Sequence, residues 1–267
     1  SDSSYEDDDG VVAPMSILDW ETLARILRHV RQNVTIEIDD RRLRTIEAVQ
    51  PFARAICGHP TITSFEDNGR FPYESLDTLF STLATLPALE SVTLRAPEVR
   101  QADESTLANP ESLTELLRAP SLRFVYLIYF KFTRALCQAT ANALMEGTAV
   151  TRLDFSACSF SSEESAAIVG NSLSRNTSVT CINVMPWCQG TIYNALAAAL
   201  PSNSTLQYLT LGRGKSPQRS SLGPAIDAPF SPVISALGQN SGLKNLIVDV
   251  PYSINESLCT AMQNGLG

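Results

Sequence analysis

The residue types that most often do chemistry are scarce in this chain and poorly spaced for it. Two histidines are present, His29 and His59, and no two cysteines form a C-x-x-C pair. A zinc site needs four nitrogen or sulfur ligands at short spacings, and a nucleophile needs a base beside it. We therefore expect no metal, no cofactor, no catalytic residues and no enzyme activity. Buried free thiols in a reducing compartment account for Cys57, Cys137, Cys158, Cys181, Cys188 and Cys259.

Charge and hydropathy exclude two further classes of partner. The net charge is −8, and five of the acids lie in the first ten residues, SDSSYEDDDG. The remaining chain is close to balanced and has no basic cluster that would neutralise nucleic-acid phosphates. The sequence GRGK at 212–215 lacks the spacing of a phosphate-binding loop. An uninterrupted apolar run of about 18 residues is absent, so we expect neither a nucleic-acid partner nor a membrane span.

The elements that position the remaining candidate residues recur along the chain. A burst of the form apolar-x-x-apolar-x-apolar returns at intervals of 27 to 37 residues, which is typical of a solenoid. The bursts start at Asn33, Ile62, Leu89, Leu122, Val150, Val179, Leu206 and Leu243, the first of them degenerate.

A helix is predicted before each burst, because an apolar residue stands six positions upstream of every start and usually another four positions earlier. Ser161 and Ser162 can cap one such helix ahead of Glu163 and Glu164. Asn or Gly ends several helices three positions before the burst, where we expect a left-handed backbone. Each strand–helix unit then buries its apolar edge against the next.

This L-x-x-L-x-L pattern resembles the leucine-rich repeats of the ribonuclease-inhibitor class over about residues 16–267. The resemblance implies an α/β horseshoe of about eight repeats, with a parallel concave sheet and convex helices. We expect one such domain at 16–267 behind a disordered acidic tail at 1–15. An opening cap helix is expected at about 16–32, and a closing helix at about 255–264. The position eight residues into the repeat usually holds Asn or Cys in this family. Here it holds Cys158 in one copy but Trp187, Phe130 and Gly214 in others, so uneven turns are expected there.

The repeat register predicts which strand residues face outward on the concave side. The fourth unit presents the large side chains of Phe124, Tyr126 and Ile128, with Tyr129 continuing the row. Aromatic anchors beside a charged rim are typical of protein–protein hot spots. The predicted partner-binding residues are Phe124, Tyr126, Ile128, Arg95, Arg152, Asp154, Met185, Tyr208, Glu37, Asp39 and Glu66. The competing interpretations are that a loop or the tail folds over Phe124 and Tyr126, or that their exposure is simply tolerated.

The favoured function is therefore a non-catalytic scaffold that binds a protein partner on the concave face. The alternatives are a regulator of another enzyme, such as a GTPase-activating protein, or a structural subunit of a larger assembly. Ran GTPase activators are similar in repeat class but have more repeats and an acidic tail at the other end. We expect a free monomer. We interpret the long loops at about 97–110 and 212–232 as tolerated insertions, with contact to a partner as the alternative.

A cytoplasmic or other reducing intracellular location is expected, and no signal peptide is visible. N-x-S/T sequons at Asn33, Asn176, Asn203 and Asn255 leave secretion as the alternative. Asn176 and Asn203 stand at the helix-ending position, where the repeat explains them without a sugar.

Overall fold

The computed structural model describes most of the chain between residues 22 and 249. The described residues are 22, 25–27, 29–38, 46–68, 71, 73–96, 109–185, 191–212 and 231–249. The expected acidic tail, the expected closing helix, Asp39 and most of the two long loops lie outside them. Of the expected opening helix, residues 22, 25–27 and 29 are described and helical, and Leu27 is buried as predicted.

Strands and helices alternate along the described chain, in the places where the bursts and the upstream apolar pairs predict them. The elements are β1 (Val34–Ile38), α2 (Ile46–Ile56), β2 (Ile62–Asp67), α3 (Tyr73–Ala84), β3 (Ser91–Arg95), α4 (Glu111–Leu117), β4 (Phe124–Ile128), β5 (Lys131–Phe132), α5 (Arg134–Glu146), β6 (Arg152–Ser156), β7 (Ser159–Phe160), α6 (Glu163–Leu173), β8 (Cys181–Met185), α7 (Thr191–Ala199), the 3-10 helix η2 (Leu200–Ser202), β9 (Tyr208–Gly212), α8 (Ser231–Leu237) and β10 (Asn245–Asp249).

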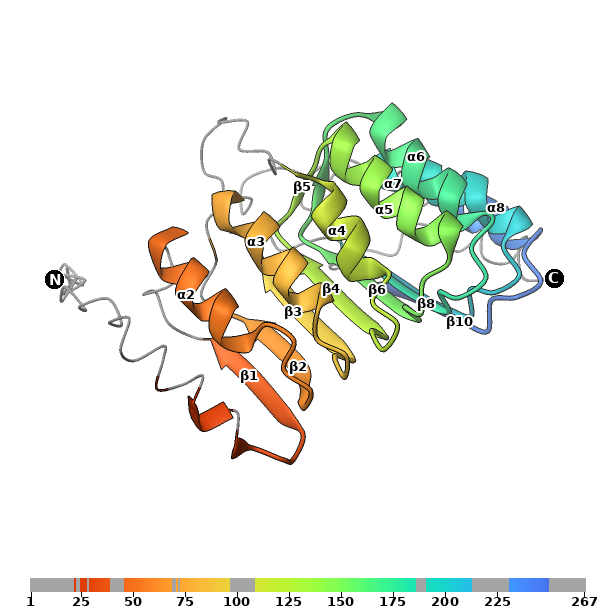
Figure 1. Cartoon of the computed structure of the whole chain (residues 1–267). Helices are drawn as coiled ribbons and strands as arrows, with labels where there is room; N and C mark the ends of the chain where they lie inside the picture. Colours follow the sequence, from red (N-terminus) through yellow and green to blue (C-terminus); the bar gives the residue numbers. More distant parts are fainter. Residues whose placement is uncertain are drawn as a thin grey trace, which may run out of the picture.

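Eight of the strands form one sheet in the order β1-β2-β3-β4-β6-β8-β9-β10, and every pairing in it is parallel. The helices lie side by side over one face of this sheet, and each contacts the next helix along the chain (Figure 1). The predicted α/β class with a parallel sheet and helices on one side is therefore confirmed. We call the face of the sheet opposite the helices the open face.

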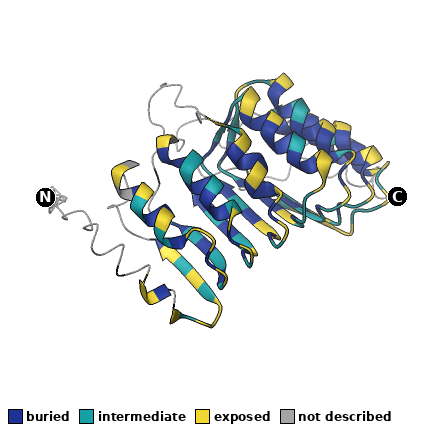
Figure 2. Ribbon diagram, in the orientation of Figure 1, coloured by how far each residue is buried: buried dark blue, intermediate teal, exposed yellow. Residues whose placement is uncertain are grey.

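The strand register agrees with the register of the sequence repeat. Val92 pairs with Val125, Val125 with Leu153, Leu153 with Ile182, and Ile182 with Leu209. All five side chains are at most 1% exposed and point toward the helices. Figure 2 shows the matching pattern on the helices, whose sheet-facing sides are buried and whose outer sides are exposed.

Side-chain caps start the helices where the sequence predicts them. The Ser162 hydroxyl accepts a hydrogen bond from the Ser165 amide at 3.1 Å and caps α6. A hydrogen bond with Ser162 also lowers the pKa of Glu164 below its ordinary value. Thr133 caps α5 in the same way, with the Leu136 amide as donor at 3.3 Å. Carboxylates in the first turn of α6 add to this through the helix dipole.

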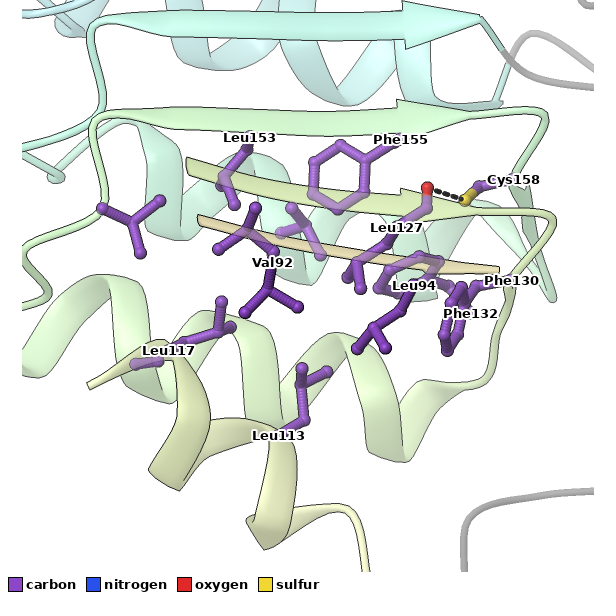
Figure 3. Close-up of a cluster of buried hydrophobic side chains, with 14 of the residues drawn as sticks. Val92, Leu94, Leu113, Leu117, Leu127, Phe130, Phe132, Leu153, Phe155 and Cys158 are labelled. Carbon is purple, nitrogen blue, oxygen red and sulfur yellow. Dashed lines mark hydrogen bonds between the residues drawn. The ribbon is translucent and has the colours of Figure 1, made fainter. Parts of the chain in front are cut away.

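A cluster of phenylalanines fills the core at one end of the central strands (Figure 3). The Phe132 ring lies 5.3 Å from that of Phe155 and 5.1 Å from that of Phe160, and Phe130 stacks on Phe80 at 6.4 Å. The Cys158 thiol is buried beside them and donates to the Leu127 carbonyl at 3.1 Å. Its predicted structural role is confirmed, and burial raises its pKa.

The turns that follow β4 and β6 are alike, whereas the sequence predicts uneven turns at this edge. Tyr129 and Ala157 occupy equivalent positions and have φ values of 65° and 55°. The residues that follow pair as the short parallel strands β5 and β7. The Phe130 ring therefore fills the position of Cys158 by packing instead of hydrogen bonding, and the expected irregularity is wrong here. Trp187 and Gly214, at the same position, lie outside the described residues.

The asparagines that end the helices act through their side chains. Asn203 has φ −95°, and in the described chain only Tyr129 and Ala157 among non-glycine residues have positive φ, so the expected left-handed asparagines are wrong. The Asn203 amide donates to the Leu173 carbonyl at 2.5 Å and accepts from the Thr205 and Leu206 amides. Asn176 and Asn240 repeat this pattern one unit before and after. We call this series the amide ladder.

His59 takes the same position in an earlier unit. Its Nε2 donates to the Leu27 carbonyl at 2.8 Å, and its Nδ1 accepts from the Thr61 amide at 3.4 Å. Leu27 and Leu173 occupy equivalent positions six residues before a burst. The buried imidazole therefore makes the hydrogen bonds that an asparagine side chain makes in later units, and His59 has a structural role.

Candidate functional site

The open face carries three rows of side chains that cross the strands. The first row runs through Thr35, Ser64, Ser91, Phe124, Arg152, Cys181, Tyr208 and Asn245. The second runs through Glu37, Glu66, Thr93, Tyr126, Asp154, Asn183, Thr210 and Ile247. The third includes the neighbours Arg95 and Ile128 and the neighbours Ser156 and Met185. Ten of the predicted site residues thus lie on one face, and Asp39 lies outside the described residues.

An aromatic group holds an arginine at the centre of this face. The Arg152 guanidinium lies over the Phe124 ring at 5.7 Å and donates to the Tyr126 hydroxyl at 3.3 Å. Phe124 is 36% exposed, whereas Tyr126 and Ile128 are half-buried. The strand pairing brings these side chains together, because Phe124 lies directly opposite Arg152 and Tyr126 opposite Asp154. Of the three large side chains of β4, Phe124 is the one most available for contact.

The hydrogen bonds of the Asp154 carboxylate are made within the sheet. It is 9% exposed, its Oδ1 accepts from the Ser156 amide at 2.8 Å and from the Ser156 hydroxyl, and its Oδ2 accepts from the Asn183 amide at 2.6 Å. Both oxygens therefore have partners, and each bond links β6 to itself or to β8. A carboxylate so satisfied fixes neighbouring strands and offers little to an incoming molecule.

The face continues toward the C-terminal end with further apolar side chains. Tyr208 on β9 is 47% exposed and lies opposite Cys181 on β8. Ile247 on β10 is 54% exposed and lies opposite Thr210. Ile247 was not among the predicted site residues, although its outward position follows from the same repeat register.

The N-terminal end of the face is acidic. Glu37 and Glu66 lie directly opposite each other on β1 and β2. The side-chain amide of Asn68 donates to both, at 3.4 and 3.3 Å. Neither glutamate forms an ion pair with a described residue, so two negative charges stand side by side on β1 and β2.

The third row adds a second arginine to the face. Arg95 lies opposite Ile128 and is half-buried. Its Nε is buried and finds no hydrogen-bond partner in the described part of the chain. Tyr129 does not continue the outward row as predicted, because its left-handed backbone turns the chain and its side chain packs against the core.

The structure shows which of the sequon asparagines are accessible to a sugar. Asn176 and Asn203 are 4% and 6% exposed, and their side-chain nitrogens donate within the amide ladder, which leaves no room for a sugar. Asn33 is exposed, and Asn255 lies outside the described residues.

No cluster of His, Cys, Asp or Glu with metal-site geometry occurs within the described ranges. Among the helices that the structure describes, none is long and apolar enough to cross a membrane.

Comparisons with known proteins give limited likenesses. No protein-family model matches the chain, and no curated protein matches its sequence. Among solved structures, the actin-binding site 2 of leiomodin-1 is similar over 50% of this chain and 73% of that chain, with 17% identity and a TM-score of 0.34. The apo structure of 3-keto-D-glucoside 4-epimerase, YcjR, from E. coli is similar over 96% of this chain and 94% of that chain, with 14% identity and a TM-score of 0.26. At these TM-scores, neither likeness identifies a family or an activity for this chain.

Proposed function

We propose that this chain is a leucine-rich repeat protein of the ribonuclease-inhibitor class that binds a protein partner on its open face. The family proposal is supported by the 27 to 29 residue spacing of most units and by the register of the sheet, which follows that spacing. We propose in addition that the sheet curves into a horseshoe and that the chain contains about eight repeats.

The observation that carries the binding proposal is the exposure of Phe124, Tyr208 and Ile247 on the open face. Large apolar side chains are 36%, 47% and 54% exposed there. Phe124 and Tyr208 lie on strands with a parallel partner on each side, and Ile247 lies on β10, which pairs with β9. Exposed apolar groups that gather on one surface mark interaction sites in proteins. A rigid sheet presents them without a loss of backbone entropy on binding, which favours complementarity over conformational change.

Binding is proposed in preference to catalysis because the polar groups near the site are committed to structure. The Ser156 hydroxyl donates to Asp154. Away from the open face, the buried His59 donates to the Leu27 carbonyl at the turn before β2. Neither arrangement places a base against a nucleophile.

The test is an affinity capture from native extract with the wild-type chain and with a Phe124→Ser/Tyr208→Ser variant. Both side chains are exposed, so their replacement should leave the far-UV circular dichroism spectrum and the melting temperature nearly unchanged. A protein retained by the wild type should be lost from this variant. The matched control is Met145→Ser, because Met145 is 48% exposed on α5, away from the open face. Equal loss from the control, or equal retention by all three chains, would move the binding site elsewhere.

A further inference from the structure

The two charged residues of β6, Arg152 and Asp154, contact the strands on opposite sides of β6. Arg152 reaches to Phe124 and Tyr126 on β4, whereas the carboxylate of Asp154 is bound by Ser156 and by Asn183 on β8. Although the two side chains share one strand and one face, no ion pair joins them. The Arg152 guanidinium is therefore ordered by an aromatic ring and a hydroxyl, is exposed, and forms no ion pair with any described carboxylate.

A guanidinium in this state is preorganised for an external anion. It presents several N–H donors in a planar fork that matches a carboxylate, and stacking on an aromatic ring reduces the side-chain entropy lost on binding. Arg95, two strands away on the same face, adds a buried Nε without a partner in the described chain. The exposed Arg152 guanidinium is the group that an acceptor from outside can reach, whereas the Arg95 Nε is buried.

The charged side chains of the open face indicate which kind of anion can bind there. Among the outward strand residues whose side chains the structure describes, two arginines, Arg95 and Arg152, face three carboxylates, Glu37, Glu66 and Asp154, for a sum of −1. Nucleic acid needs a continuous basic track along its phosphates, and the described residues of this face form none. A few carboxylates within a mostly neutral protein segment fit the two arginines and avoid the acidic end.

Because the proposed function places a protein partner on the open face, we infer that the partner contributes an acidic segment with an apolar side chain beside the acid. Its carboxylate binds the Arg152 guanidinium, and its apolar side chain lies between Phe124 and Tyr208. These two anchors are three strands apart, which is about 14 Å at the usual strand spacing.

The acidic end of the face sets the direction of this segment. Glu66 also lies three strands from Arg152, again about 14 Å, and Glu37 lies one strand further. An extended chain covers that distance in about four residues. Repulsion excludes an acid over Glu37 and Glu66, whereas a lysine or arginine about four residues from the acid is stabilised there.

The experiment selects random 12-residue peptides displayed on phage against the folded wild-type chain. We expect enriched peptides to contain Asp or Glu next to an aromatic or aliphatic residue. Their affinities are then measured by fluorescence anisotropy with wild type, Arg152→Gln and Phe124→Ser. We expect Arg152→Gln to weaken binding by about 10- to 100-fold. The matched control is Arg175→Gln, because Arg175 is an exposed arginine outside the strands and should change affinity less than about 2-fold.

A double-mutant cycle makes the assignment specific to the proposed pair. Replacing the peptide's acid with its amide should weaken binding to the wild type by the same factor and should make Arg152→Gln neutral. Enriched peptides that are basic or uncharged, depend on Phe124 and ignore Arg152 would overturn the inference and leave the proposed function standing. Peptides that bind Phe124→Ser and Arg152→Gln as they bind wild type would overturn both. Binding of a single-stranded oligonucleotide that requires Arg152, without binding of acidic peptides, would replace the inference with a nucleic-acid site.

Discussion

At the scale of single residues, the same residue type has different roles in different surroundings. Cys57 is exposed near Thr85, Cys181 lies half-buried on the open face, and Cys137 and Cys158 are buried. Burial removes the water that stabilises a thiolate, so it raises the pKa of Cys137 to about 12 and raises that of Cys158 as well. The thiolate is the reactive form, so reactivity should follow burial.

We therefore expect iodoacetamide at pH 8 to label Cys57 in the folded chain and to leave Cys137 and Cys158 unmodified. With a pKa of about 12, roughly one Cys137 thiol in 10⁴ is ionised at this pH, and access is blocked as well. Peptide mapping by mass spectrometry reads out each site. A urea-unfolded sample, in which all cysteines should react, is the control. Rapid native labelling of Cys158 would contradict its buried position beside Leu127.

At the scale of elements, the amide ladder joins each turn to the one before it. The Asn203 side chain is 6% exposed and has hydrogen-bond partners in two consecutive units, the Leu173 carbonyl on one side and the Thr205 and Leu206 amides on the other. Removal of the side chain leaves buried backbone groups unsatisfied, and each such group costs about 1 to 3 kcal/mol.

Asn203→Ala should accordingly lower the free energy of unfolding by about 3 kcal/mol. Urea denaturation followed by circular dichroism measures this value by linear extrapolation. Asn194→Ala, at an exposed position of α7, is the matched control and should change it by less than about 0.5 kcal/mol. Equal effects of the two substitutions would show that the ladder contributes nothing specific.

At the scale of the whole molecule, contacts run between neighbours along the chain. Each helix touches the next, and each strand of the large sheet pairs with the strands of adjacent units. Stability in such an array is close to a sum of local terms and nearest-neighbour interfaces. Damage at one position should therefore stay near that position.

Leu209→Ala tests this, because Leu209 is 1% exposed in β9 and its truncation should cost about 3 kcal/mol. Hydrogen–deuterium exchange should rise most in β8, β9 and β10 and least in β2 and β3. The reciprocal variant, Val92→Ala in β3, should raise exchange mainly in β2, β3 and β4. Uniform loss of protection across the sheet in both variants would indicate one cooperative unit.

The sequence by itself determined the strands of the large sheet, the helices before them, and the inward or outward direction of the residues in those strands, but not the short strands β5 and β7. These follow from local periodicity, since side chains alternate along a strand and a repeated unit repeats its register. Val92, Leu153 and Leu209 were accordingly predicted to be buried, and Phe124 and Tyr208 to face outward.

Only the tertiary structure decided which outward residues are free to bind. Asp154 is held by Asn183, 29 residues away, and Arg152 by Tyr126, 26 residues away. The helix-ending asparagines likewise bond across units instead of adopting a left-handed backbone. In each case a residue type permits several hydrogen-bonding roles, and the choice depends on neighbours that only the folded sheet brings within reach.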